Sequence, residues 1–379
     1  MNRVPPFDLS EQYKLIGESI QAATLEVLAS GRYIGGPTVE QFEREFANYI
    51  GTSECIACNS GTDALYLALR ALEVGPGDEV ITTPFTFVAT AEVISAVGAT
   101  PVFVDIDLDS FNLNLDQVEA AITDRTRAVI PVHLFGHPVD MTRLMAIAQS
   151  KNLFIVEDCA QATGAEWAGQ KVGSIGHVGC FSFYPTKNLG ACGDGGAITT
   201  NDPAIRDRLR RLRDHGRKGA YFYEELGVNS RLDAVQAAIL QIKLTHLETW
   251  NQQRRDVAQR YQQFLSPISG LALPQEATNG KSVWNQYTIR VTQPSQANDS
   301  SKLFRDQLRD RLQEKGVLSM VYYPLSLHLQ PAYKNLGYQP GQLPMAEQAS
   351  QEVLSLPMFP ELTQEQQEQV AYTLKDCLI

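Results

Sequence analysis

Between about residues 54 and 200, short apolar runs rich in β-branched and aromatic residues alternate with stretches of helical periodicity. The apolar runs lack a strict alternation with polar residues, which is typical of strands buried on both faces. They lie at 54–60, 78–87, 100–106, 127–135, 153–159, 179–183 and 196–200. The helical stretches between them lie at 61–72, 88–97, 115–122 and 140–150. Strands that alternate with helices predict an α/β domain with a largely parallel sheet.

A long helical pattern follows this region at residues 230–265, where apolar positions recur at three-, four- or seven-residue steps over much of the length. Asn229 and Ser230 are candidate N-cap residues for this helix. The rest of the chain carries a strand candidate, a helix and a loop rich in Tyr, Pro and His, at 283–291, 301–316 and 321–333. Because so long a helix usually bridges two domains, we expect a large domain at 1–250 and a small α+β domain at 251–379.

The composition is that of an ordinary globular protein: of 379 residues, 44% are hydrophobic and 20% are charged, with a formal net charge of −11. This acidic balance argues against nucleic acid as a partner, and we expect the densest basic stretch, 206–213, to be the solvated side of a helix. No run approaches the ~20 consecutive apolar residues of a membrane span, and the N-terminus lacks a signal-peptide pattern. The six cysteines suit reduced thiols. We therefore expect a cytoplasmic protein without a membrane partner.

The candidate chemistry centres on residues 181–198, FSFYPTKNLGACGDGGAI, where Lys187 follows an aromatic, strand-like run. We expect this lysine to emerge at a strand end, and the glycines that follow it to let the backbone pass close to something bulky. The run 153–159 carries a carboxylate, Asp158, at the strand end where open α/β sheets bind their ligands. A lysine nucleophile and a strand-end carboxylate are therefore expected in one sheet domain.

A phosphate site is the third candidate feature. The P-loop pattern GxxxxGK[ST] is absent, and GACGDGG does not fit the GxGxxG of dinucleotide-binding domains. A better cradle is NSGTD at residues 59–63, where a strand ends and a helix begins with unpaired N–H groups and a hydroxyl. Taken alone, this turn is more simply an N-cap. Together with the lysine and the carboxylate, it matches the three handles of pyridoxal phosphate: the aldehyde, the ring nitrogen and the phosphate.

With these residues the chain resembles the DegT/StrS family of nucleotide-sugar aminotransferases, which depend on pyridoxal phosphate. The resemblance runs nearly end to end, through blocks at 33–47, 58–65, 77–91, 98–107, 156–167, 181–198, 214–217, 229–240 and 354–363. Any one block is weak evidence, but so many in order make the resemblance specific. It implies the aspartate-aminotransferase-like fold (fold type I), with a mixed, mostly parallel sheet in the large domain and a smaller C-terminal α+β domain.

The resemblance also implies roles for individual residues. Lys187 is implied to form the Schiff base and shuttle a proton, Asp158 to pair with the pyridinium nitrogen, and Gln161 to contact the ring or its 3-hydroxyl. The implied phosphate and ring contacts are Gly61, Thr62, Asp63, Ser182 and, stacking on the ring, Phe85. Asn229 is implied to reach the phosphate of the neighbouring subunit, which implies a homodimer with shared active sites. The implied sugar pocket includes Tyr33, Arg231, Tyr322, Tyr323 and His328. Without the resemblance, Phe85 is better explained as core, Ser182 as a backbone contact and Asn229 as a helix cap.

The implied reaction is a ping-pong transamination from an amino acid, expected to be L-glutamate, to the keto group of a nucleotide-linked 3-keto or 4-keto hexose. Such reactions serve amino-sugar, polysaccharide or natural-product biosynthesis. Three alternatives stay open: a sugar dehydratase of the same family, a cyclic amino-acid precursor synthase and a regulatory protein. Lys187 counts against the dehydratase, because family members of that type have histidine at the lysine position.

Two further features bear on the site. His133 and His137 are spaced like a zinc pair, but VHLFGHP contains Gly and Pro and cannot form one helix face, so no metal is expected. The family often has glutamine at position 137, and GYNSR where this chain reads GVNSR at 227–231. These departures lie at the margin of the implied pocket and bear on the substrate rather than on the cofactor.

Overall fold

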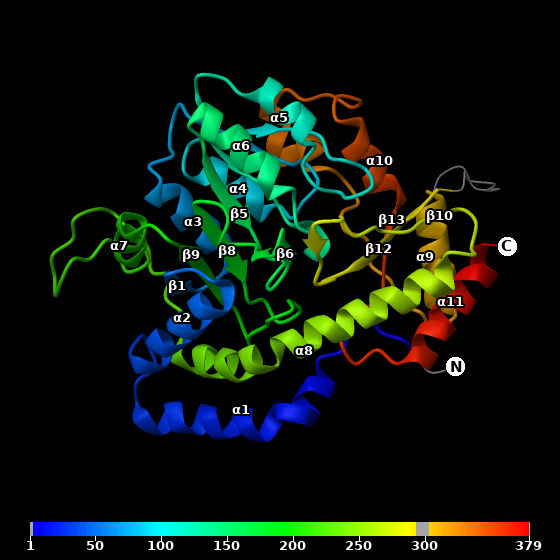
Figure 1. The fold of residues 1–379 in the computed structure, drawn as a ribbon, viewed down its shortest axis with the longest axis horizontal. Helices are drawn as coiled ribbons and strands as arrows, with labels where there is room; N and C mark the ends of the chain where they lie inside the picture. The colour runs from blue at the N-terminus through cyan, green and yellow to red at the C-terminus, as the bar shows by residue number, and fades with distance from the viewer. Residues whose placement is uncertain (1–2, 293–302, 379) are drawn as a thin grey trace.

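The computed structural model describes residues 3–292 and 303–378, and its largest feature is a seven-stranded sheet in the order β1-β9-β8-β5-β4-β2-β3 (Figure 1). Among these seven strands, β9 alone runs against its neighbours. The sheet is therefore mixed and mostly parallel, which confirms the expected α/β class. The strands are β1 (Glu54–Cys58), β2 (Glu79–Thr82), β3 (Thr100–Phe103), β4 (Thr126–Ile130), β5 (Phe154–Asp158), β8 (Val178–Ser182) and β9 (Gly196–Thr200).

Helices pack on both faces of this sheet. Alternate side chains of β5 show the two faces: Ile155 belongs to one buried cluster with Leu144 of α6, and Val156 to another with Leu65 of α3. The last two residues of β5 continue this alternation and place Glu157 and Asp158 on opposite faces. The first face is covered by α2 (Pro37–Ile50), α5 (Leu115–Ala121), α6 (Met141–Lys151) and part of α8 (Ala234–Leu265), and the second by α3 (Gly61–Ala71), α4 (Ala89–Ala96) and α7 (Pro203–Leu212).

Helix α8 runs from beneath the large sheet to a second, antiparallel sheet of three strands (Figure 1). On α8, Leu247 packs in the core of the large sheet, whereas Val257 packs in the core of the second. This change of partner supports a domain boundary near residue 250, which we keep as a proposal. Val4 also packs in the second core. The elements here are β10 (Leu271–Ala272), β12 (Tyr287–Val291), β13 (Val353–Leu356), α9 (Phe304–Glu314), α10 (Pro344–Glu352) and α11 (Gln364–Leu378).

Several bounds differ from those expected. Helix α8 begins at Ala234 rather than at 230, because the preceding segment is extended; the hydroxyl of Ser230 donates to Asn59 Oδ1 at 3.1 Å and caps nothing. The strand expected at 283–291 starts at Tyr287. Residues 301 and 302 of the expected helix lie outside the described ranges. Unexpected elements include the two N-terminal helices, α2 and α1 (Ser10–Ser30), of which α1 packs along α8. They also include a small sheet of β6 (Glu166–Trp167), β7 (Gln170–Lys171) and β11 (Gly280–Lys281).

Within residues 3–292 and 303–378, no helix combines the length and the apolar character that crossing a bilayer requires. Of the six cysteines, five are buried and Cys192 is exposed, and none forms a disulfide.

Candidate active site

A cavity of about 510 Å³ opens where the parallel strands β2, β4, β5 and β8 end. This volume falls within the usual range of small-molecule sites, roughly 300–1,000 Å³. The loops after these strands supply most of the lining, and the segment before α10 adds two tyrosines. The structure thereby brings together eight of the residues expected from the sequence: Gly61, Thr62, Asp158, Gln161, Ser182, Lys187, Tyr322 and Tyr323.

Hydrogen bonds hold both the backbone and the carboxylate of Asp158. Its backbone N–H donates to Pro131 O at 2.9 Å, and its carbonyl accepts from the N–H of His133 at 3.1 Å, which ties β5 to the segment after β4. On the carboxylate, Oδ2 accepts from the Thr90 hydroxyl at 2.8 Å and Oδ1 from the Ala160 N–H at 3.1 Å. Burial raises the pKa of Asp158 above its usual value, while these two hydrogen bonds and the charge of Lys187 oppose the rise. The site thus holds a desolvated carboxylate in one orientation.

Lys187 lies in the turn that follows β8, where its N–H donates to Tyr184 O at 2.9 Å. Desolvation lowers the pKa of its amine to about 8, and the Asp158 carboxylate partly offsets this by favouring the charged form. An amine with this pKa is partly neutral at physiological pH, and the neutral form is the one that a nucleophile or a base requires. The two groups therefore form an electrostatically coupled pair within one cavity.

A buried asparagine cluster holds the segment that carries Lys187. The Nδ2 of Asn188 donates to Asn251 Oδ1 at 2.7 Å and to Val283 O at 2.8 Å. Its Oδ1 accepts from the Nδ2 of Asn285 at 2.8 Å. Because these partners lie on α8 and on the segment before β12, the cluster fastens the Lys187 turn to both of these elements.

The NSGTD turn provides the N-terminus of α3. The Ser60 hydroxyl accepts from the Asp63 N–H at 3.1 Å and is the N-cap, so the simple capping role is present. Gly61 and Thr62 line the cavity beside Ser182, and their N–H groups lie in the first turn, where helices have no internal acceptor. A Cβ at Gly61 would approach the Cβ of Ser182 to 2.6 Å. The turn is thus packed closely against Ser182 and still offers anion-binding donors.

Gln161, Tyr322 and Tyr323 also line the cavity, and Gln161 and Tyr323 are joined by a hydrogen bond. Gln161 Oε1 accepts from the Phe135 N–H at 2.7 Å, and its Nε2 donates to the Tyr323 hydroxyl at 3.3 Å. Burial raises the pKa of Tyr323, so this hydroxyl stays protonated. The ring of Tyr323 meets that of Phe85 edge to face, with 5.9 Å between centroids.

Two sequence-based interpretations need correction. Phe85 is fully buried, stacks on Phe111 and does not line the cavity; the chain leaves β2 at Thr82, and Phe87 lines the cavity with 58% of its surface exposed. The glycines after Lys187 mainly admit the chain's own atoms rather than a bulky ligand. A Cβ would meet Pro185 O at 2.3 Å from Gly190, Ser60 at 2.4 Å from Gly196, Phe183 and Leu232 from Gly195, and Gln236 from Gly193.

Five further expected residues lie outside the cavity lining within this chain. Tyr33 is exposed and its hydroxyl donates to Leu28 O; Asp63 lies in the first turn of α3. Asn229 is exposed, and Arg231 pairs with Asp214 at 2.9 Å. His328 is buried, with Nε2 3.2 Å from Glu347 Oε1. The single chain therefore does not place these five in the site.

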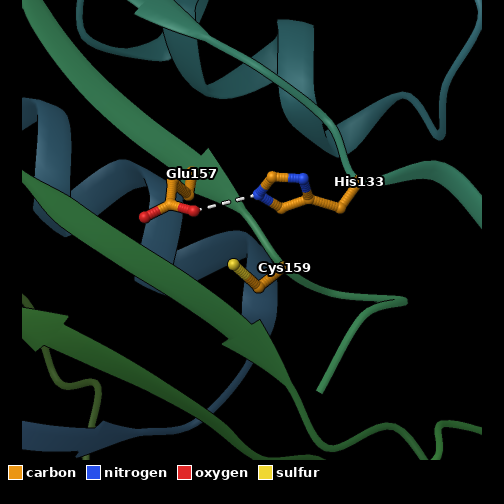
Figure 2. Close-up of side chains that lie close together, drawn as sticks. All are labelled: His133, Glu157 and Cys159. Atoms are coloured by element: carbon orange, nitrogen blue, oxygen red, sulfur yellow. Dashed lines mark hydrogen bonds and ion pairs between the residues drawn. The ribbon is translucent and has the colours of Figure 1, made fainter. Parts of the chain in front are cut away.

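Figure 2 shows the cluster of described residues that has metal-ligand geometry: His133, Glu157 and Cys159, all buried on the face of β5 opposite to Asp158. His133 Nδ1 accepts from the Val139 N–H at 3.0 Å, so Nε2 carries the proton that points to Glu157 Oε2, also at 3.0 Å. Glu157 further accepts backbone N–H groups of residues 173, 175 and 176 at 2.6–2.9 Å. Its carboxylate is satisfied by four N–H donors, which favours a buried structural anion over a metal ligand.

The structure also adds cavity residues that the sequence did not single out: Thr86, Phe87, Thr90, Tyr184, Asp194 and Gln286. Thr86, Phe87, Thr90 and Tyr184 lie within or next to aromatic runs, where the local spacing of residues does not distinguish cavity lining from core. Among the described residues of the lining, Lys187 is the one cation, beside the two carboxylates of Asp158 and Asp194.

A model of the DegT/DnrJ/EryC1/StrS aminotransferase family matches residues 14–375, and the chain therefore belongs to this family. It is 49% identical to a "pleiotropic regulatory protein" of Geobacillus stearothermophilus, over 97% of this chain and 96% of the relative. It is 46% identical to dTDP-3-amino-3,4,6-trideoxy-alpha-D-glucose transaminase of Streptomyces venezuelae, over 96% and 93% of the two chains. The structure is similar to that of DesV from S. venezuelae, with TM-score 0.94, 44% identity and coverage of 99% and 98%.

These comparisons confirm the family, fold type I and the class of enzyme expected from the sequence. Aminotransferases of this family depend on pyridoxal phosphate, as expected. The solved structure of NtdA from Bacillus subtilis holds PMP; it is similar at TM-score 0.89 and 32% identity, covering 100% of this chain and 86% of that one. The cavity fits this cofactor, since it combines a partly neutral lysine, a fixed carboxylate and a helix N-terminus beside a hydroxyl.

Proposed function

We propose that this protein transfers the amino group of an amino acid, L-glutamate, to the keto group of a nucleotide-linked hexose. The observation that carries the proposal is the pairing of Lys187 with Asp158 in a cavity that also exposes the N-terminus of α3. The transaminase of S. venezuelae, 46% identical, is named for a 3-amino sugar, which supports a 3-keto hexose as the first substrate to test.

Bound pyridoxal phosphate supplies an aldehyde that carries the amino group and a ring that accepts electrons. The Asp158 carboxylate would hold the proton on the ring nitrogen and so keep the ring electron-poor. The first-turn N–H groups at Gly61 and Thr62, with the Ser182 hydroxyl, would hold the phosphate. Phe87, which lines the cavity where Phe85 does not, would pack against the ring.

Lys187 anchors the cofactor through Nζ. Once freed, the Lys187 amine, whose pKa burial lowers to about 8, would be the base that takes the proton from the amino acid α-carbon and delivers it to the former aldehyde carbon of the cofactor. General acid–base catalysis of this kind typically contributes ~10²–10⁴-fold. Tyr322 and Tyr323 also line the cavity, and we propose that they contact the sugar.

We further propose a homodimer whose partner completes the site. The proposed cofactor and substrate carry several anionic groups, yet the described lining of the cavity has one cation, Lys187. An arm at residues 214–229, closed by antiparallel bridges at Asp214–Asn229 and Arg217–Tyr223, extends away from the body (Figure 1). Its aromatic tip is exposed: Tyr221 by 89% and Phe222 by 63%. The arm, with Asn229 at its base, is suited to reach a second copy and contribute there.

The test is a panel of nucleotide-linked 3-keto and 4-keto sugars incubated with glutamate and the cofactor. We expect 2-oxoglutarate and an amino sugar in equal amounts from at least one 3-keto sugar, and no product from the Lys187→Ala variant. Sugar turnover without stoichiometric 2-oxoglutarate would indicate the dehydratase. Full activity of Lys187→Ala would refute the proposed role of the lysine.

The name of the Geobacillus relative keeps a regulatory role as the second candidate. A gel-shift assay at physiological salt tests direct DNA binding, which the net charge of −11 disfavours. Specific retardation at nanomolar protein, together with no turnover across the sugar panel, would favour the regulator.

A further inference from the structure

We propose that Thr90 and Thr86 form a hydrogen-bond relay that positions the Asp158 carboxylate toward the cofactor ring. The relay rests on the proposed role of Asp158 at the ring nitrogen. The two threonine hydroxyls lie 3.1 Å apart, and Thr90 Oγ1 lies 2.8 Å from Asp158 Oδ2. Both threonines line the cavity and are buried, with Thr90 1% and Thr86 3% exposed. Neither threonine is among the site residues predicted from the sequence.

The direction of the relay follows from the number of protons available. An ionised carboxylate can only accept, so the single hydroxyl proton of Thr90 is committed to Asp158. The oxygen of Thr90 then accepts, and the hydroxyl proton of Thr86 is committed to Thr90. A protonated Asp158 could donate on this side and reverse the chain. The direction from Thr86 through Thr90 to Asp158 is therefore the one that accompanies the ionised carboxylate, the form that can accept the ring N–H.

The relay also opposes the effect of burial. Desolvation raises the pKa of Asp158, and the Thr90 hydrogen bond is the first of the interactions that lower it again. The Ala160 N–H fixes the other oxygen, so each carboxylate oxygen has one protein donor and one lone pair left for the ring. Because Thr90 lies in the first turn of α4, the rigid helix sets the position of its hydroxyl.

A binding experiment separates this positioning from simple packing. The apoprotein is titrated with pyridoxamine phosphate, which forms no bond to Lys187, and with the analogue in which a C–H replaces the ring nitrogen. The variants are Thr90→Val, which keeps the shape without the hydroxyl, Thr90→Ser, which keeps the hydroxyl, and Thr86→Val. The control is Thr82→Val: Thr82 is equally buried at the end of β2, but its hydroxyl donates to Ile130 O at 2.9 Å, away from Asp158.

We expect Thr90→Val to weaken pyridoxamine phosphate about tenfold, the scale of one charge-assisted hydrogen bond, and to leave the analogue within about twofold. The quantity compared is the ratio of the dissociation constants of pyridoxamine phosphate and the analogue. Thr86→Val should change this ratio by about threefold, while Thr90→Ser and Thr82→Val should leave it unchanged. Equal weakening of both ligands by Thr90→Val would show a packing role only, and an unchanged ratio in Thr90→Val or Thr86→Val would overturn the relay. These ligands contain no sugar, so the result does not depend on whether a sugar is aminated; a wild-type protein that binds neither ligand would instead refute the proposed function.

Discussion

The lowered pKa of Lys187 gives a quantitative prediction about its reactivity in the apoprotein. Desolvation places this pKa at about 8, against about 10.4 for an ordinary lysine. At pH 7.5, roughly 24% of such an amine is neutral, compared with roughly 0.1% of an ordinary one, a ratio of about 200 from the titration relation. A less basic amine is also less nucleophilic, so the position of the inflection in pH is a firmer test than the absolute rate.

The assay is competitive acylation of the apoprotein with a trace reagent from pH 6 to 11, with the label at each lysine quantified by peptide mass spectrometry. N-acetyl-lysine amide in the same tube reports the ordinary amine. Labelling of Lys187 should rise with pH and level off above about 8. In Asp158→Asn the inflection should move lower still, because the carboxylate that favours the charged amine is gone. An inflection near that of the free amine, or one that moves up in Asp158→Asn, would refute the reasoning.

Three further predictions concern other residues. Phe87→Ala should weaken cofactor binding with little loss of stability, whereas the buried Phe85→Ala should cost about 3–5 kcal/mol in urea unfolding; the reverse ranking would restore Phe85 to the site. Asn188→Leu should lower the free energy of unfolding by about 2–4 kcal/mol, because two asparagine partners lose their bonds; a loss under about 1 kcal/mol would show that the cluster relaxes. Burial lowers the pKa of His137 to about 4, so between about pH 6.5 and 4 the imidazole is protonated in the unfolded chain and neutral in the folded chain. From pH 6.5 to 4 the wild type should therefore lose about 3 kcal/mol more stability than His137→Gln, and parallel pH profiles would contradict this.

Much of the fold followed from apolar runs that alternate with helical periodicity, since burial on both faces leaves a clear pattern in a parallel sheet. Asp158 and Lys187 could be located because Asp158 lies at the end of such a run and Lys187 follows another, and the carboxyl ends of parallel strands gather at one edge. The two N-terminal helices were missed: α1 packs along α8. Its role depends on a partner more than 200 residues away, which local periodicity does not reveal.

The details of the site depended on tertiary contacts. Phe85 and Phe87 are two residues apart beyond the end of β2, so a strand alternation could not tell core from lining. Thr90 donates a hydrogen bond to the carboxylate of Asp158, 68 positions further along the chain, and the sequence around Thr90 does not predict this contact. His328 lies in a loop rich in aromatic residues, but its imidazole is hydrogen-bonded to Glu347 rather than placed in the cavity.

The most direct test of the account is to find where the cofactor attaches. The purified protein is incubated with pyridoxal phosphate, reduced with borohydride and digested, and the modified peptide is sequenced by mass spectrometry. We expect one stoichiometric adduct, on Lys187, and none in Lys187→Ala. Adducts spread over surface lysines, with Lys187 unmodified, would contradict the central claim that this amine and the Asp158 carboxylate together hold the ring.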